Sequence, residues 1–248
     1  MIYIIGSGHI GSSLAEYFSD RGYDLQVLGR NTWPDRFREE DTIINCAASG
    51  YRKKRYGVVG TVEDNFLLPV KLDGKRNGAN MIHISSWNEE CACNNPYAWS
   101  KALATEYFTT DKDKYSAHIC MTSSVWGGKF ESPEKFMGTF LRACSRDEPY
   151  LITHPFRRRD FVHIDTFSYA IEQLTKTRDY NKRYFATGRL TSFYSVYAML
   201  KQIAGREFPK VQFADDLTAN YDWRPISPMF EDTFKEDLER EWRILCAS

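Results

Sequence analysis

The stretch IYIIGSGHIG, residues 2–11, decides the expected fold of this 248-residue chain. Its first four residues are apolar and suit a buried β-strand, and three glycines follow at once in the spacing Gly-x-Gly-x-x-Gly. The next segment, SSLAEYF (residues 12–18), has apolar residues at helical spacing. A strand, a glycine turn and a helix in this order are typical of a dinucleotide-binding unit.

Each glycine of this loop has a separate task. Gly6 permits a tight turn, Gly8 keeps side chains away from an approaching pyrophosphate, and Gly11 lets the helix pack close to the sheet. The pyrophosphate is expected on the free N–H groups of the helix N-terminus, where the helix dipole favours negative charge. The predicted cofactor contacts therefore come from the whole loop: Gly6, Ser7, Gly8, His9, Ile10 and Gly11.

The end of the second expected strand, residues 25–28, bears on the choice of cofactor. Gly29, Arg30 and Asn31 follow it, with no acidic residue among them. A site that prefers NAD usually places Asp or Glu there to hold the ribose 2′-hydroxyl. The guanidinium of Arg30 suits the 2′-phosphate of NADP instead, but it also suits a solvated loop. We therefore expect NADP or NAD, with Arg30 as the argument for NADP.

The second decisive stretch is YAWSK, residues 97–101. The four-residue spacing puts Tyr97 and Lys101 on one helix face, and the ammonium is expected to lower the tyrosine pKa from its usual value near ~10. An apolar strand shortly before them ends in Ser85 and Ser86, and a serine hydroxyl there can hydrogen-bond a substrate carbonyl or alkoxide. We predict Ser86, Tyr97 and Lys101 as catalytic residues, with Ser85 as the alternative serine and a cofactor neighbour.

The order of the expected elements indicates an α/β fold. Strand-like and helical segments alternate up to about residue 121, which predicts a doubly wound, mostly parallel Rossmann sheet. A chain of 248 residues with 42% hydrophobic residues can bury one substantial core and a small appended lobe. We expect a dinucleotide-binding domain over 1–127, to which 158–190 return, and a small C-terminal substrate-binding lobe from 128–157 and 191–248.

Composition excludes several classes of partner. Lys+Arg and Asp+Glu balance at 33 each, so no basic field favours nucleic acid. The first strand begins at Ile2 and no apolar run approaches the roughly 20 residues that span a bilayer, which predicts a cytoplasmic protein without a membrane segment. Cys91 and Cys93 are closer together than zinc ligands usually are, so we expect no metal.

With these motifs in place, the chain resembles the extended short-chain dehydrogenases/reductases, the family of nucleotide-sugar epimerases, dehydratases and 4-keto-sugar reductases. Further matching segments are IINCAA (residues 43–48), Asn65 before a long helix, TSSVWG (122–127) and RDFVHID (159–165). The resemblance implies that Ala47, Ala48 and Ser124 lie beside the cofactor and that Arg159 binds the substrate diphosphate.

The chain departs from this family in two ways. Eleven positions separate Ser86 from Tyr97, about half of what the family usually has, which implies a shortened member with a truncated substrate loop. Trp87 and Asn88 stand where the dehydratases carry Asp-Glu, which disfavours dehydration.

The resemblance implies an NAD(P)-dependent oxidoreductase acting on a nucleotide-linked sugar, by keto-sugar reduction or by epimerisation through a transient ketone. The alternative is a non-catalytic, dinucleotide-binding regulatory subunit of the same fold. A nucleotide sugar is the expected partner, and a homodimer through the helices after Asn65 and Tyr97 is a further possibility. The sugar, the nucleotide and the carbon attacked stay open.

Overall fold

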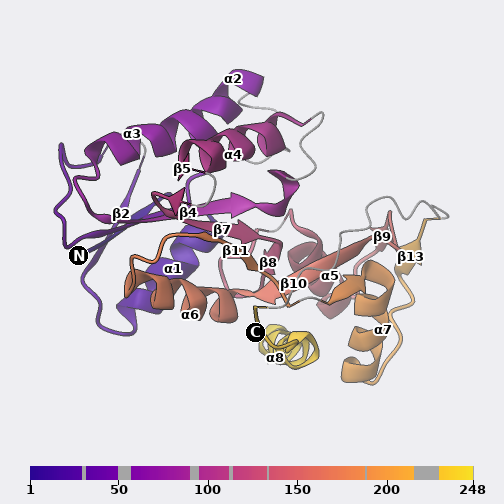
Figure 1. Ribbon diagram of the computed structural model, residues 1–248. Helices are drawn as coiled ribbons and strands as arrows, with labels where there is room; N and C mark the ends of the chain where they lie inside the picture. Colours follow the sequence, from indigo (N-terminus) through magenta and orange to yellow (C-terminus); the bar gives the residue numbers. More distant parts are fainter. Residues whose placement is uncertain are drawn as a thin grey trace. The chain divides into compact units, whose positions relative to one another are not determined.

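The computed structural model describes residues 1–29, 32–49, 57–89, 95–111, 114–132, 134–187, 189–214 and 229–247 (Figure 1). The chain divides into two compact units. The first consists of Met1–Thr122 with Phe167–Tyr184, and the second of Ser123–Thr166 with Phe185–Ser248. Each unit is described by itself below.

The first unit is built on the largest sheet of the described chain, which has six strands. In spatial order these are β2 (Leu25–Leu28), β1 (Ile2–Ile5), β3 (Thr42–Asn45), β4 (Asn80–Ser86), β7 (His118–Thr122) and β11 (Lys182–Phe185). The pairings from β2 to β7 are parallel; Ile4, for example, pairs with Val27 on one side and Ile44 on the other. The predicted α/β fold with a mostly parallel sheet is confirmed.

Helices cover both faces of this sheet (Figure 1). One face carries α1 (His9–Ser19) and α6 (Ile164–Thr175), and the other carries α2 (Gly57–Val62), α3 (Leu68–Lys75) and α4 (Pro96–Tyr107). Because the central strands are covered on both sides, their side chains are buried throughout, which explains why neighbouring residues such as Ile43 and Ile44 are both apolar. The carboxyl ends of the strands are left for ligands, as in other open α/β sheets.

The resemblance predicts a long helix after Asn65, and the structure is less regular there. Between α2 and α3 the helix widens into a π-helical turn, η1 (Glu63–Leu67), which contains the buried Asn65. Such wide turns are frequent at functional sites.

The second unit holds two small sheets and three helices in its described part. Strand β10 (Arg158–His163) pairs in parallel with β8 (Ser124–Trp126) and antiparallel with β12 (Leu190–Ser192), while β9 (Tyr150–Ile152) pairs with β13 (Val211–Phe213). Its helices are α5 (Phe136–Ser145), α7 (Phe193–Ala204) and α8 (Phe234–Ala247). Large aromatic and aliphatic side chains fill its core: Trp126, Phe140, Phe161, Leu200, Phe208 and Trp242.

A short hairpin of the first unit, β5 (Thr109–Asp111) with β6 (Lys114–Tyr115), completes the described elements.

The last helix of the described chain, α8, begins at Phe234. In the part of the chain that the structure describes, no helix is both long and apolar enough to cross a membrane.

Candidate active site

The glycine loop between β1 and α1 has the geometry that its sequence predicts. Gly6 has a φ of +97°, and a Cβ on it would lie 2.9 Å from the backbone of Ala47. A Cβ on Gly11 would lie 2.0 Å from the carbonyl oxygen of Gly6. These two glycines therefore let the start of α1 lie directly on the turn and beside the end of β3.

Gly8 differs from the other two because a Cβ on it would meet nothing within 4 Å. It precedes α1 in an extended conformation, and no side chain caps the helix there. The first turn of α1 also contains no acidic residue, so nothing in this helix opposes an anion at its positive end. The open backbone and the uncapped helix fit a diphosphate group.

Tyr97 is positioned by the start of α4. The side chain of Asn95 caps this helix by accepting a hydrogen bond from the Tyr97 amide at 2.9 Å, and Pro96 occupies the first helical position. The Tyr97 hydroxyl is hydrogen-bonded to Ser86, whose oxygen also accepts from the Asn88 amide at 3.2 Å. The structure thus brings together two of the three predicted catalytic residues.

Ser85 has a different environment from Ser86. It is buried, and its hydroxyl donates to the Glu89 carboxylate at 2.7 Å. Of the two serines that the sequence leaves open, Ser86 is therefore the one that contacts Tyr97.

Lys101 lies one helical turn after Tyr97, and only 2% of its surface is exposed. Its ammonium donates to the carbonyl oxygen of Ile84 at 2.7 Å. Burial lowers the pKa of Lys101 to about 8, although the nearby Cys46 and Glu89 act in the opposite direction.

The pKa of Tyr97 is raised, and this corrects the expectation that Lys101 lowers it. Burial has the largest effect on the Tyr97 pKa, the hydrogen bond with Ser86 lowers it, and the negative charge of Glu89 raises it. Spacing along the helix places Lys101 near Tyr97 but does not show that burial removes water from the phenol. In this structure the Tyr97 hydroxyl carries its proton at neutral pH and is a proton donor.

Asn65, in the π-helical turn, connects the loop after β3 to α4. Its side-chain oxygen accepts from the Ser49 amide at 2.9 Å, and its side-chain nitrogen donates to the Ser49 carbonyl and to Ser100 Oγ. Ser100 in turn donates to the Tyr97 carbonyl at 3.0 Å. Asn65 therefore stabilises the helix that carries Tyr97 against the loop that contains Ala47 and Ala48.

Glu89 is the residue of this region that the sequence analysis missed. Its carboxylate is buried and accepts hydrogen bonds from Ser85 and Thr105. A glutamate in a short polar stretch gives no periodic signal of burial, so only the fold reveals it.

The comparisons with known proteins can now be set beside this geometry. No protein-family model matches the sequence, and no curated protein matches it. Solved structures match over nearly the whole chain. MoeE5 in complex with UDP-glucose and NAD aligns at a TM-score of 0.74 and 19% identity, covering 100% of this chain and 99% of that one. The chain has the fold of the extended short-chain dehydrogenases/reductases.

Two further structures with this fold show the same relationship. The UDP-N-acetylglucosamine 4-epimerase from Methanobrevibacter ruminantium aligns at a TM-score of 0.77 and 16% identity, over 99% of this chain and 98% of that one. RMD from Pseudomonas aeruginosa, complexed with NADPH, aligns at a TM-score of 0.72 and 14% identity, over 99% of this chain and 97% of that one. Each match spans both chains almost fully.

The remaining predicted site residues lie in several places. Ala47 and Ala48 are in the loop after β3, where Ala48 is exposed. Ser124 begins β8 and Arg159 lies in β10, both in the second unit. Arg30, Cys91 and Cys93 fall outside the described residues. Among the residues that are described, no three His, Cys, Asp or Glu side chains form a possible metal site.

Proposed function

We propose that this protein is an NAD(P)-dependent oxidoreductase that acts on a nucleotide-linked sugar, either reducing a keto-sugar or inverting a hydroxyl through a transient ketone. The observation that carries the proposal is the hydrogen bond between Ser86 and Tyr97, with the buried Lys101 one helical turn away. These three residues belong to the same compact unit as the glycine loop. The similarity to enzymes that act on nucleotide sugars supports the choice of substrate class.

The residues of the glycine loop would hold the diphosphate of the dinucleotide: Gly6, Ser7, Gly8, His9, Ile10 and Gly11. Ala47, Ala48 and Ser124 would line the cofactor, and Lys101 would bind its ribose hydroxyls. When bound, the nicotinamide supplies or accepts the hydride. Structures of this fold contain NAD or NADPH, so both cofactors belong in the test and Arg30 is our argument for NADP.

Tyr97 would donate its proton to the substrate oxygen during reduction, and Ser86 would hydrogen-bond the same oxygen. The protonated state of Tyr97 in this structure suits that direction. In an epimerase the same tyrosine must first accept a proton and then return it. Arg159 would bind the substrate diphosphate, since a guanidinium pairs well with phosphate oxygens.

The test is the absorbance of the reduced nicotinamide in the presence of NADPH or NADH and a panel of UDP- and GDP-linked sugars, including their 4-keto forms. Cofactor-dependent turnover of at least one member supports the proposal. Retention of tightly bound NAD through purification indicates an epimerase, and free exchange of NADPH indicates a reductase. Silence across the panel overturns the catalytic assignment.

A second candidate function is a non-catalytic regulatory subunit that binds a dinucleotide. The short segment between Ser86 and Tyr97 motivates it, because that segment contributes to the substrate pocket in the family that the chain resembles. Calorimetric binding of NADPH together with silence across the sugar panel favours this alternative.

A further inference from the structure

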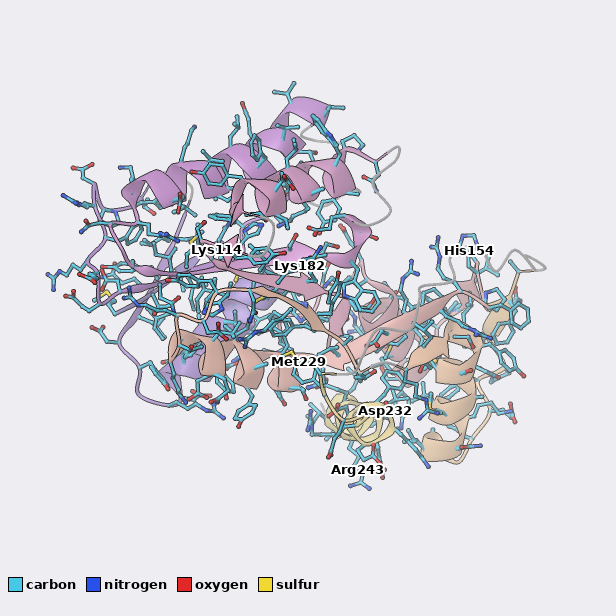
Figure 2. All side chains as sticks on the ribbon, viewed as in Figure 1. Lys114, His154, Lys182, Met229, Asp232 and Arg243 are labelled. Carbon is cyan, nitrogen blue, oxygen red and sulfur yellow. The ribbon has the colours of Figure 1, made fainter. Side chains whose placement is uncertain are left out.

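A buried carboxylate, Glu89, is tied to both elements that carry the proposed catalytic residues. Its side chain is 4% exposed, and the residue stands three positions after Ser86, the last residue of β4. One carboxylate oxygen accepts from Ser85 Oγ at 2.7 Å and from Thr105 Oγ1 at 2.8 Å. The other oxygen lies 2.9 Å from the ammonium of Lys182, which β11 contributes and which Figure 2 labels.

The identity of these donors connects Glu89 to the site. Ser85 is the neighbour of Ser86, which hydrogen-bonds Tyr97. Thr105 lies one helical turn after Lys101 on α4, and Lys101 lies one turn after Tyr97. A single carboxylate therefore connects the end of β4 to the helix face that presents Tyr97 and Lys101.

Glu89 is also the anion that acts on both groups. Three titratable groups act on Tyr97 or Lys101 or are acted on by them: Glu89 after β4, Cys46 after β3 and His83 within β4. Burial raises the pKa of the Cys46 thiol to about 12 and lowers the pKa of His83 well below its ordinary value, so both are neutral at pH 7. Glu89, paired with Lys182, therefore supplies the negative charge among these described groups.

We propose that Glu89 is a positioning residue of the proton-transfer site, which ties the end of β4, with Ser86, to the helix that carries Tyr97 and fixes the negative charge that acts on the phenol. The inference rests on the proposed function for its enzymatic meaning. A carboxylate held by two hydroxyls and an ammonium cannot turn away from the site without leaving a buried charge unpaired. Its negative charge therefore acts on Tyr97 from a fixed position and disfavours the phenolate.

The first experiment measures the ionisation of Tyr97 directly, by NMR of protein carrying ring-labelled tyrosine without added cofactor. The Tyr97→Phe variant assigns the signal. Glu89→Gln removes the charge and keeps an oxygen that accepts a hydrogen bond, so we expect Tyr97 to ionise at lower pH than in the wild type. The control is Glu106→Gln, which removes the same charge from an exposed position on α4 and is expected to leave the titration unchanged.

A second variant covers the case in which Glu89→Gln does not fold. Lys182→Met removes the cation that lies 2.9 Å from the Glu89 carboxylate. Tyr97 then experiences the full negative charge and should ionise at higher pH. An unchanged Tyr97 titration in the folded Glu89→Gln protein, or a shift to lower pH in Lys182→Met, overturns the proposal.

Activity provides a separate readout once a substrate is found. In Glu89→Gln the alkaline limb of kcat/KM for reduction should move to lower pH, whereas a purely structural loss would lower the rate at every pH. If no member of the sugar panel is turned over, the proposed function fails while the NMR titration still decides the role of Glu89.

Discussion

Two alanine substitutions in the glycine loop separate the requirements of folding from those of binding. In Gly11→Ala the new Cβ would lie 2.0 Å from the Gly6 carbonyl oxygen, so α1 must move by more than about 1 Å to reach an ordinary contact. Overpacking of this kind costs about 1–3 kcal/mol, and the better helix propensity of alanine recovers at most about 1 kcal/mol. The movement also disturbs Leu14 and Phe18, which are fully buried on the same helix.

The matched variant is Gly8→Ala, where the new Cβ meets nothing within 4 Å and the backbone is already extended. We expect its unfolding free energy to stay within about 0.5 kcal/mol of the wild-type value, as for other exposed substitutions. The side chain would, however, stand on the open surface where the diphosphate is proposed to bind. Gly8→Ala should therefore lose dinucleotide affinity while it keeps its stability.

The assay pairs thermal denaturation with calorimetric titration of NADPH and NADH. A net loss of about 1–2 kcal/mol in Gly11→Ala lowers the melting temperature by about 2–8 °C for a chain of this size. A Gly11→Ala protein that melts and binds like the wild type would show that the loop is not packed as described. Unchanged dinucleotide affinity in Gly8→Ala would place the cofactor elsewhere.

Two further predictions concern the dependence of stability on pH. Because burial lowers the pKa of Lys101 from 10.5 to about 8, the folded protein binds fewer protons than the unfolded chain between these values, and its stability gains from rising pH. Urea denaturation should show that the unfolding free energy of the wild type rises relative to that of Lys101→Met from pH 8 to pH 10. A constant difference in unfolding free energy between the two proteins would contradict the burial of the Lys101 ammonium. Hydrogen bonds from Tyr23 and Lys176 lower the pKa of Glu172 from 4.5 to about 2, so its contribution is complete above pH 4.5 and disappears as the pH falls towards 2. Melting temperatures over this acid range should fall less steeply in Glu172→Gln than in the wild type; parallel curves would refute the argument.

The sequence predicts those parts of the fold that are decided locally. Strand β1 occupies residues 2–5 as expected, because an apolar run ends abruptly at a glycine that must turn. The start of α4 is equally local, since the cap at Asn95 and the proline after it need no distant partner. These two local signals position the glycine loop and Tyr97.

The remaining features depend on contacts between distant segments. The three-residue strand β8 is defined by its pairing with β10, and no periodic pattern identifies so short an element. Glu89 becomes part of the site only through Thr105 and Lys182, which other elements contribute. The pKa of Tyr97 is raised rather than lowered because burial, which spacing along a helix does not report, has the largest effect on the phenol.

The central claim is that the Tyr97 hydroxyl transfers a proton in a nicotinamide-dependent reaction of a nucleotide-linked sugar. The most direct test compares the wild type with Tyr97→Phe in the absorbance assay, using the panel member that the wild type turns over, with NADPH binding of both proteins measured by calorimetry. We predict a loss of turnover of at least about a hundredfold, the low end for a general acid, with dinucleotide affinity retained. Turnover at the wild-type rate by the phenylalanine variant would contradict the account.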